Sequence, residues 1–412
     1  MNSDTILAQS SKLGIQLGLE RIQTLLANLN NPQQNYPIIH VAGTNGKGSV
    51  CAYLSSILTA AGYKTGRYTS PHFIDWTERI TLNETPITNS DLEKYLLQVK
   101  QAINTENEPT QFEIITAVAW LYFAEKKVDI AIMEVGLGGR LDATNVCEKA
   151  LVSIITSIGL DHTEMLGPTL ADIAFEKAGI LKPQIPSIIG KVPPQAKQVI
   201  QQKITELNCP VTWIEPATLH PTKPNTAIYK NIEYPLPLAG DVQLINSAIA
   251  IETILNLKQQ GWKISQENII QGIEKTRWPG RIQWVKWREN QLLIDGCHNP
   301  DNALALRRYL DSQNINSVNW VIGMMARKDH QAIFQALLRP QDRLYLVPIP
   351  DSGSAKPEEL LTLAKSLNIP LQESRCFPDL ETGLITASQH LDKTTVLCGS
   401  LYLIGHFLKA NV

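Results

Sequence analysis

The chain has 412 residues, of which 37 are Lys or Arg and 39 are Asp or Glu, so its formal net charge at pH 7 is −2. At about 100–200 residues per domain, this length indicates two or three domains. The near-neutral charge excludes a protein that binds nucleic acid mainly through bulk positive charge. Any polyanionic ligand must therefore be held locally, by a few placed groups.

The cysteine spacing and the hydropathy pattern indicate a cytoplasmic protein. Six cysteines are scattered along the chain without a C-x-x-C pair, which is typical of reduced thiols and not of a disulfide framework or a zinc site. Residues 1–14 lack the basic flank and apolar run of a signal peptide. The longest apolar stretch, residues 114–124, is too short to cross a bilayer. We expect neither a membrane nor a nucleic-acid partner.

The first part of the chain alternates between strand and helix patterns. Residues 17–29 carry apolar side chains at helical spacing, and Asn31-Pro32 ends this predicted helix. Strands are predicted at 36–42, 64–69, 128–135, 151–158 and 187–189, and helices at 50–62 and 112–125. This alternation predicts a parallel sheet that is covered by helices on both faces.

A second alternating series begins near Leu292. Its strands are predicted at 292–296, 318–325, 343–349 and 395–398, and its helices at 331–338, at 357–367 and from Pro300 onward. The Pro-Gly turn at 277–281 lies between the two series and is the predicted linker. We therefore predict two α/β domains, residues 1–280 and 281–412.

A glycine-rich segment, GTNGKGS at 43–49, lies between a predicted strand and a predicted helix. Such a turn presents backbone N–H groups to an anion at the positive end of the helix dipole. Gly43, Gly46 and Gly48 allow close approach, Lys47 supplies a positive charge, and the Ser49 hydroxyl can reach a magnesium ion. Because Gly48 separates Lys47 from Ser49, the segment departs from G-x-x-x-x-G-K-[ST], and a simple connecting turn is the alternative.

The segment 40–49 resembles the phosphate loop of the Mur ligase superfamily, in the form found in folylpolyglutamate synthases and dihydrofolate synthases. The resemblance continues in order through YTSPH (68–72), ERI (78–80), FE (112–113), EVGLGGRLDATN (134–145), IGLDHTEMLG (158–167), IAFEKAGI (173–180), RWPGR (277–281) and DGCHNPD (295–301). It implies a P-loop parallel-sheet ATPase domain followed by a smaller, Rossmann-like α/β domain. It also implies an ATP-dependent ligase that joins L-glutamate to dihydropteroate, to reduced folate, or to both, through an acyl phosphate.

The resemblance assigns nucleotide contacts to both predicted domains. The loop residues are Gly43, Thr44, Asn45, Gly46, Lys47, Gly48 and Ser49. Asn246 matches the position that contacts adenine, although such a residue can also cap a helix or lie on the surface. Arg281 matches a contact to the ATP phosphates, and Asp295 resembles a contact to the ribose or to another part of the nucleotide. Lys47 and His298 are the expected catalytic groups, with His298 where phosphate and the amino acid meet.

Glu134 ends a predicted strand, at the sheet edge where ligands gather in such folds. A carboxylate there can hold magnesium beside bound phosphates. His162 also follows a predicted strand, but magnesium prefers oxygen, so its chemistry alone indicates an ordinary surface or core histidine. The resemblance implies two magnesium sites, held by Ser49, Ser70, Glu134, His162 and Lys177.

Lys177 lies among apolar residues, where a buried ammonium group would be costly. The residues alone favour a lysine that reaches water or pairs with Glu176. The resemblance implies instead a catalytic lysine that is carbamylated, so that the cation becomes a carboxylate and ligates the second magnesium.

The expected pterin pocket follows from the same resemblance. Leu141, Asp142 and Ala143 match pterin contacts of bifunctional family members. Ile15, Gln16, Leu17, Phe112 and Glu113 are expected to complete the pocket. Phe112 can stack on a pterin ring, although a core phenylalanine is equally common. Whether the protein adds the first glutamate, extends the chain, or does both stays open, and a monomer is the default expectation.

Two alternative functions and one alternative catalytic group are less consistent with the sequence. Peptidoglycan-type Mur ligases carry a UDP-binding domain before the phosphate loop, whereas 42 residues precede Gly43 here, fewer than the roughly 50 of a small domain. A P-loop NTPase regulatory module would leave the second α/β domain unexplained. Cys297 beside His298 suggests a thiol nucleophile, but no third group that would orient the pair is evident.

Overall fold

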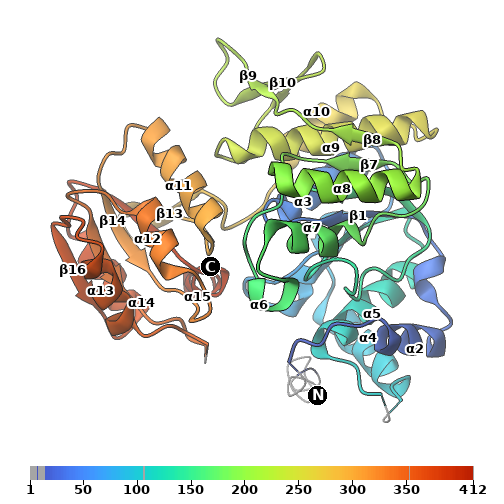
Figure 1. Cartoon of the computed structure of the whole chain (residues 1–412), viewed down its shortest axis with the longest axis horizontal. Helices are drawn as coiled ribbons and strands as arrows, with labels where there is room; N and C mark the ends of the chain where they lie inside the picture. Colours follow the sequence, from blue (N-terminus) through green and yellow to red (C-terminus); the bar gives the residue numbers. More distant parts are fainter. Residues whose placement is uncertain (1–6, 8–13, 105–106, 352, 412) are drawn as a thin grey trace. The chain divides into compact units, whose positions relative to one another are not determined.

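The structure is a computed structural model that describes residues 7, 14–104, 107–351 and 353–411 (Figure 1). Most of the segment 1–14, in which no signal peptide is expected, therefore lies outside the described residues. The chain divides into two compact units. Unit 1 comprises Met1–Pro237 and Leu244–Thr276, and unit 2 comprises Leu238–Gln243 and Arg277–Val412.

Unit 1 is built on a sheet whose eight strands, among the residues described, run in the order β4-β3-β2-β5-β1-β6-β7-β8. The strands are β1 (Ile38–Ala42), β2 (Thr65–Tyr68), β3 (Ile80–Leu82), β4 (Thr85–Pro86), β5 (Ile130–Glu134), β6 (Ala150–Ile155), β7 (Ser187–Ile189) and β8 (Val211–Trp213). The strands from β2 to β8 in this order pair in parallel, whereas β3 and β4 add an antiparallel edge. β1 and β5 are buried along their whole length, as expected for central strands of a parallel sheet.

The helices of unit 1 pack around this sheet (Figure 1). They are α2 (Glu20–Asn28), α3 (Lys47–Ala60), α4 (Asn89–Gln101), α5 (Gln111–Glu125), α6 (Thr163–Leu166), α7 (Leu170–Ala178), α8 (Pro194–Leu207), α9 (Val242–Gln259) and α10 (Gln266–Lys275). Two 3-10 turns lie at Pro32–Gln34 and Trp76–Arg79. A small antiparallel sheet of β9 (Thr218–Leu219), β10 (Thr226–Tyr229) and β11 (Ile232–Pro235) separates β8 from α9.

Unit 2 has its own sheet, with the strand order β12-β13-β17-β14-β15-β16. Its strands are β12 (Gln283–Trp287), β13 (Asn290–Ile294), β14 (Val318–Ile322), β15 (Arg343–Leu346), β16 (Glu373–Cys376) and β17 (Thr394–Cys398). Its helices are α11 (Pro300–Ser312), α12 (His330–Leu337), α13 (Pro357–Ser366), α14 (Leu380–Ser388) and α15 (Leu401–Asn411). All neighbouring strands pair in parallel except β12, which forms a hairpin with β13.

Each strand predicted in the two alternating series is present, with ends that differ by a few residues. The helix after the phosphate loop begins at Lys47 instead of residue 50, because Gly46 serves as its N-cap with φ 85°. In the two large sheets, β3, β4, β8, β12 and β16 were not predicted, and all of them except β3 lie at a sheet edge. An edge strand pairs on one side only and is shorter or less buried, so its sequence lacks the continuous apolar run of a central strand.

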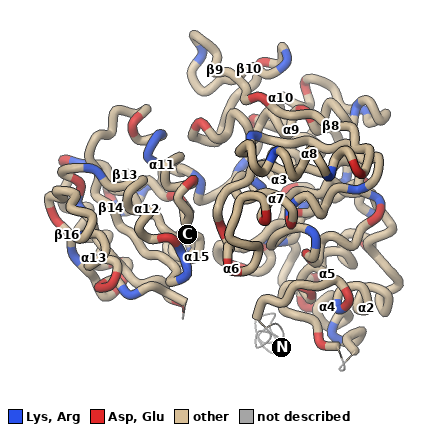
Figure 2. Tube along the Cα trace, viewed as in Figure 1, with Lys and Arg blue, Asp and Glu red and all other residues tan. Residues whose placement is uncertain are grey.

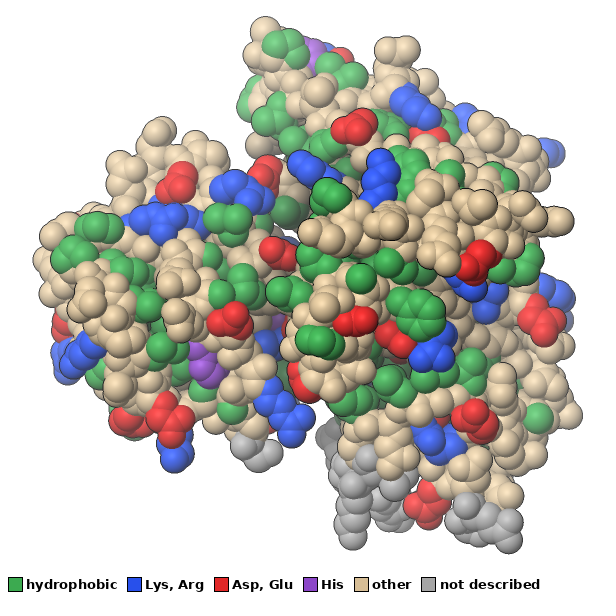
Figure 3. Space-filling view, in the orientation of Figure 1, with side chains coloured by type: hydrophobic (Ala, Val, Ile, Leu, Met, Phe, Trp, Pro, Cys, Tyr) green, Lys and Arg blue, Asp and Glu red, His purple; other side chains and the backbone are tan. Residues whose placement is uncertain are grey.

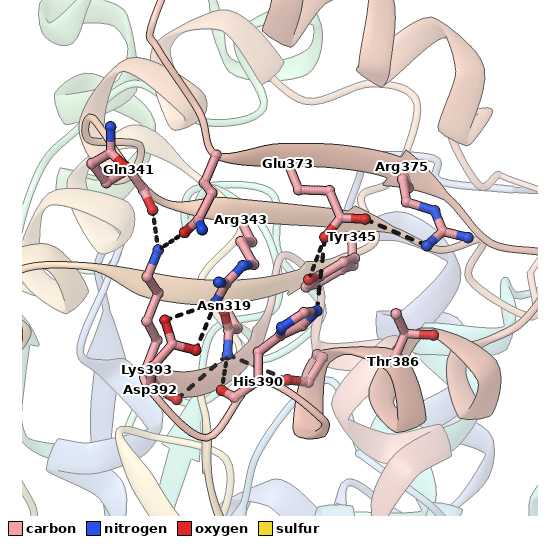
Figure 4. Close-up of polar contacts among 12 residues, drawn as sticks. Asn319, Gln341, Arg343, Tyr345, Glu373, Arg375, Thr386, His390, Asp392 and Lys393 are labelled. Atoms are coloured by element: carbon pink, nitrogen blue, oxygen red, sulfur yellow. Dashed lines mark hydrogen bonds and ion pairs between the residues drawn. The ribbon is translucent and has the colours of Figure 1, made fainter.

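Polar side chains join the amino-terminal ends of the unit 2 strands to the turn between α14 and β17 (Figure 4). The Asn319 amide donates to the His390 carbonyl at 2.9 Å. Arg343 donates to Asn319 Oδ1 at 3.2 Å and to Asp392 Oδ1 at 2.9 Å. This network lies at the opposite end of the strands from Asp295, which follows β13, so it stabilises the fold away from the predicted site.

Charged residues of both signs are interspersed along each unit (Figure 2). On the face drawn in Figure 3, neither sign forms a continuous field. Within the described part of the chain, no helix is long and apolar enough to cross a membrane. A polyanion that binds this protein therefore meets local groups, as the net charge suggests.

Helix α10 packs against α3 through a glycine, and this contact generates a stability prediction. A Cβ at Gly272 would lie 2.8 Å from the Ile57 backbone nitrogen and closer still to Ile57 Cα. We expect Gly272→Ala to lower the free energy of unfolding by about 1–2 kcal/mol, because overpacking outweighs the gain in helix propensity. Chemical denaturation followed by circular dichroism measures this change. Lys275→Ala, at an exposed position of the same helix, is the control and should change stability by less than about 0.5 kcal/mol.

Candidate functional site

The phosphate loop joins β1 to α3 in a conformation that glycine permits. Gly43 has φ 152° and Gly46 has φ 85°, both in the range that favours glycine. A Cβ on Gly43 would also collide with Oγ1 of Thr156. The first N–H groups of α3 have no acceptor within the helix, and the helix dipole favours negative charge there. The loop therefore has the backbone geometry of an anion site.

The segment that follows β6, residues 156–159, clamps this loop. The Thr44 backbone N–H donates to the Ser157 carbonyl at 2.9 Å, and the Asn45 N–H donates to Ser157 Oγ at 2.9 Å. Thr156 Oγ1 donates to the Asn45 carbonyl at 2.6 Å. Sequence reasoning missed Thr156 and Ser157, whose contacts to Asn45 span 111 and 112 residues of the chain.

Two lysines donate to the same backbone oxygen. Lys47 Nζ lies 2.9 Å and Lys177 Nζ 3.1 Å from the Gly43 carbonyl oxygen. Lys177 comes from α7 and is only 5% exposed. Burial and then the charge of Lys47 lower the pKa of Lys177 to about 7, while Asp161 and Asp142 oppose the shift. The amine of Lys177 is therefore partly uncharged near neutral pH.

From its residue type alone, Lys177 was expected to reach water or to pair with Glu176, and the structure shows neither. Its side chain does not reach solvent. The neighbouring Glu176 pairs instead with Arg140, at 2.8 Å. This ion pair joins α7 to the segment 134–145, so Lys177 lies between the phosphate loop and the predicted pterin residues.

Asn246 lies in α9 and is 5% exposed. A Cβ at Gly46 would lie 2.5 Å from Asn246 Oδ1, so the side-chain amide lies against the N-cap of α3. The structure thus places Asn246 at the phosphate loop, not on the surface. Within unit 1, this is the arrangement required if the amide contacts a nucleotide whose phosphates occupy the loop.

The predicted magnesium ligands of unit 1 lie around the carboxyl edge of β2, β5 and β6. Glu134 ends β5, and its Oε2 accepts from the Ser70 backbone N–H at 3.3 Å. Ser49 is buried in the first turn of α3. His162 has φ 53°, and its Nε2 lies 3.9 Å from Asp161 Oδ1. Across the described ranges, no three His, Cys, Asp or Glu side chains form a ready metal cluster.

Two contacts bring the predicted pterin segments together. The Gly18 N–H donates to the Leu141 carbonyl at 3.4 Å, so the segment 15–18 runs beside the loop 137–145. Arg21, which sequence reasoning missed, donates to Glu113 Oε2 at 3.0 Å. The same carboxylate oxygen accepts from the Thr110 N–H at 2.7 Å in a capping box. Glu113 is therefore engaged within the fold, where it ties α2 to α5.

Phe112 lies against the backbone of the glycine-rich segment. A Cβ at Gly136 would lie 2.8 Å from Cε2 of its ring, and the Tyr68 ring centroid is 6.3 Å away. Ile15 is 62% exposed, Gln16 is also exposed and Leu17 is half-buried. Phe112 is half-buried, so part of the residue stays accessible, as stacking on a ligand requires.

Asp142 organises the loop that carries it. Its Oδ2 accepts from the Leu137 N–H at 2.9 Å, and its Oδ1 accepts from Thr144 Oγ1 at 2.6 Å and from the Thr144 N–H at 3.0 Å. Burial raises the pKa of Asp142, whereas these hydrogen bonds lower it. Ala143 beside it is also buried. Asp142 therefore has little free acceptor capacity for a ligand.

In unit 2, the three predicted residues gather where β13 ends. Asp295 is 6% exposed, and its Oδ2 accepts from the Ile282 N–H at 2.8 Å. Burial raises the pKa of Asp295, and the nearby Arg281 guanidinium opposes this effect most strongly. His298 Nδ1 lies 2.9 Å from the Gly296 carbonyl oxygen. These residues form one cluster of acid, base and cation within unit 2.

Cys297 lies inside this cluster but has no exposed surface. A nucleophilic thiol must be able to touch its substrate, whereas this one is enclosed in the core of unit 2. The structure thus gives the thiol alternative no support.

Two family models match the chain. The Mur ligase middle domain matches residues 41–254, and the dihydrofolate synthetase C-terminal domain matches residues 281–410. The folylpolyglutamate synthase of Lacticaseibacillus casei is 34% identical in an alignment of 405 positions, gaps included, that covers 93% of this chain and 92% of the relative. The dihydrofolate synthase/folylpolyglutamate synthase of Bacillus subtilis is 33% identical in an alignment of 418 positions, gaps included, that covers 97% of this chain and 96% of the relative.

Solved structures agree with these matches. The folylpolyglutamate synthase of Mycobacterium tuberculosis, complexed with ADP and AMPPCP, has a TM-score of 0.88 at 28% identity and covers 98% of each chain. The E. coli FolC structure in complex with DHPP and ADP has a TM-score of 0.86 at 30% identity and covers 100% of this chain and 98% of that one. The expected fold is therefore confirmed. The chain belongs to the folylpolyglutamate and dihydrofolate synthases of the Mur ligase family, which are ATP-dependent ligases.

Proposed function

We propose that the protein uses ATP to join L-glutamate to dihydropteroate, to reduced folates or their polyglutamates, or to both kinds of acceptor. One observation carries this proposal: Lys47 and the buried Lys177 converge on the Gly43 carbonyl of a phosphate loop, beside the loop 137–145. Relatives named for both activities match nearly the whole chain, and one similar structure holds both DHPP and ADP. A nucleotide and a pteridine are therefore the expected ligands.

The donors in unit 1 fit magnesium. Ser49, Ser70 and Glu134 supply the oxygen atoms that this ion prefers, and Ser70 and Glu134 are already in hydrogen-bond contact. We propose that these residues, with His162 and a carbamate on Lys177, hold two ions. Magnesium would neutralise charge on the phosphates during transfer.

The residues of the chain then act by position and charge. The phosphate-loop N–H groups and Lys47 would bind the β- and γ-phosphates and stabilise the charge that develops as the γ-phosphoryl group passes to the acceptor carboxylate. The glutamate amine attacks the resulting acyl phosphate, and phosphate leaves as the amide forms. We propose that Arg281 contacts the ATP phosphates, that Asp295 contacts the ribose, and that His298 lies near the attacking amine.

The division of labour between domains is also a proposal. Residues 1–280 would form the ATP-binding domain of the Mur ligase type, and residues 281–412 the smaller α/β domain. The two family models fall on either side of this division. We expect a monomer in the cytoplasm, where the six cysteines, all of them free in the structure, would stay reduced.

Product mass tests the function directly. Incubation with ATP, L-glutamate and either dihydropteroate or tetrahydrofolate should give products that are heavier by one glutamate, or by several. A single addition to dihydropteroate alone indicates a dihydrofolate synthase, and serial additions to tetrahydrofolate indicate a polyglutamate synthase. No glutamylated product from either acceptor, with ATP hydrolysis retained, would support the NTPase alternative instead.

Lys47→Ala should lower kcat for ligation by roughly 100-fold or more, because it removes a charge that faces the transferring group. Circular dichroism should show the fold retained, since only bonds to the Gly43 and Thr44 carbonyls are lost. Lys64→Ala, at a residue outside the loop, is the matched control and should keep wild-type turnover. Ligation by Lys47→Ala at the wild-type rate would contradict the assignment.

Lys177 should take up CO2 as a carbamate. Carbamate forms on the uncharged amine, so uptake should rise as the pH increases through about 7, the pKa of Lys177. Incubation with 13C-bicarbonate followed by 13C NMR should show a carbamate signal that Lys177→Met abolishes. Lys182→Met, at a second lysine whose pKa burial lowers, is the control and should keep the signal. If CO2 depletion leaves the ligation rate unchanged and no carbamate signal is seen, the modification is excluded.

A further inference from the structure

A buried hydrogen-bond chain links the phosphate-loop strand to the loop 137–145. His40 lies in β1, three residues before Gly43, and is 1% exposed. Its Nε2 lies 2.8 Å from Thr144 Oγ1, and Thr144 Oγ1 donates to Asp142 Oδ1 at 2.6 Å. No functional role was predicted for His40 from the sequence.

The direction of each hydrogen bond in this chain follows from proton count. Burial, with a smaller effect of Lys182, lowers the pKa of His40 to about 3, so the ring is neutral at pH 7 and carries one N–H. Thr144 has one hydroxyl proton, which goes to the carboxylate of Asp142. Thr144 Oγ1 can then only accept from His40, so the ring proton resides on Nε2.

The loop that ends this chain touches both sides of the proposed reaction. Asp142 closes the loop by accepting from N–H groups at its two ends, Leu137 and Thr144. On one side, the Leu141 carbonyl accepts from the segment 15–18. On the other side, a Cβ at Gly139 would lie 2.9 Å from the Glu176 carbonyl oxygen, next to Lys177. The orientation of Asp142 therefore sets the backbone of the pocket wall.

We propose that His40 is a positioning residue for the pteridine substrate: by donating to Thr144, it orients Asp142 and holds the loop 137–145 in its binding conformation. This inference rests on the proposed function, because that function names the substrate. Asp142 then acts as an organiser of the loop, and the surface offered to the ring comes from the loop backbone and from Phe112. The His40 side chain makes none of the contacts to the Gly43 carbonyl, so nucleotide binding should be independent of it.

Four substitutions test the hydrogen-bond chain from His40 through Thr144 to Asp142. His40→Met and Thr144→Val keep the approximate volume but remove the hydrogen bonds, and each should raise KM for the pteridine about tenfold with KM for ATP unchanged. His40→Gln places an amide nitrogen near the position of Nε2, and Thr144→Ser keeps the hydroxyl, so both should restore most of the affinity. The double variant His40→Met/Thr144→Val should be no worse than the poorer single variant, because both act through one interaction.

Steady-state kinetics with each substrate varied gives the two KM values, using whichever pteridine acceptor the wild-type protein glutamylates. A merely structural role would raise both KM values or lower thermal stability equally in the Met and Gln variants. Equal KM shifts for ATP and pteridine, no shift at all, or no rescue by Gln would overturn the inference.

Amide hydrogen exchange separates this test from the proposed function. His40→Met should speed exchange in 137–145 but not in 43–49, and His40→Gln should not. If the wild-type protein makes no glutamylated product, the proposed function fails, yet the exchange result still decides whether His40 positions the loop. Unchanged exchange in His40→Met would show that it does not.

Discussion

Two ammonium groups share one backbone oxygen at the start of α3, and the rest of the site depends on this contact. The Gly43 carbonyl accepts from Lys47 at 2.9 Å and from Lys177 at 3.1 Å, in a place where Lys177 is almost fully buried. Two like charges this close repel each other, and burial makes a charged Lys177 more costly still. A phosphate, or the loss of the Lys177 charge, relieves the repulsion. An anion bound at the loop would therefore lower the electrostatic free energy of the two lysines.

The sheet of unit 1 brings the remaining groups to this point. β1 lies between β5 and β6, so the segments that leave all three strands meet at one edge. The segment after β6 clamps the phosphate loop, while β5 ends at Glu134 and leads into the loop 137–145. α7 closes the arrangement from outside, since Glu176 pairs with Arg140 while the adjacent Lys177 reaches Gly43. Strand order alone therefore brings the proposed nucleotide site beside the proposed pteridine site.

The central elements and the phosphate loop were predictable from sequence because each has a local signal. Buried parallel strands are continuous apolar runs, and glycines mark the loop. The capping box Thr110-x-x-Glu113 was also readable, and it would have shown that Glu113 is held within the fold. The partners Arg21, His40 and Thr156 could not be predicted in this way. Their contacts join positions separated by 92, 104 and 111 residues, and only the folded sheet sets those distances.

The glycine contact between α3 and α10 has a mechanical consequence. Because Gly272 has no side chain, the backbones of the two helices approach each other closely there. The Gly272 carbonyl accepts a hydrogen bond from the Ser56 hydroxyl of α3 at 2.5 Å. The same carbonyl accepts from Thr276 at 2.9 Å, the residue at which unit 1 ends. A displacement of α3 at this contact must therefore be shared by α10 or disrupt the packing, because close-packed interfaces yield little. α10 thus connects the helix that follows the phosphate loop with Thr276, the last residue of unit 1.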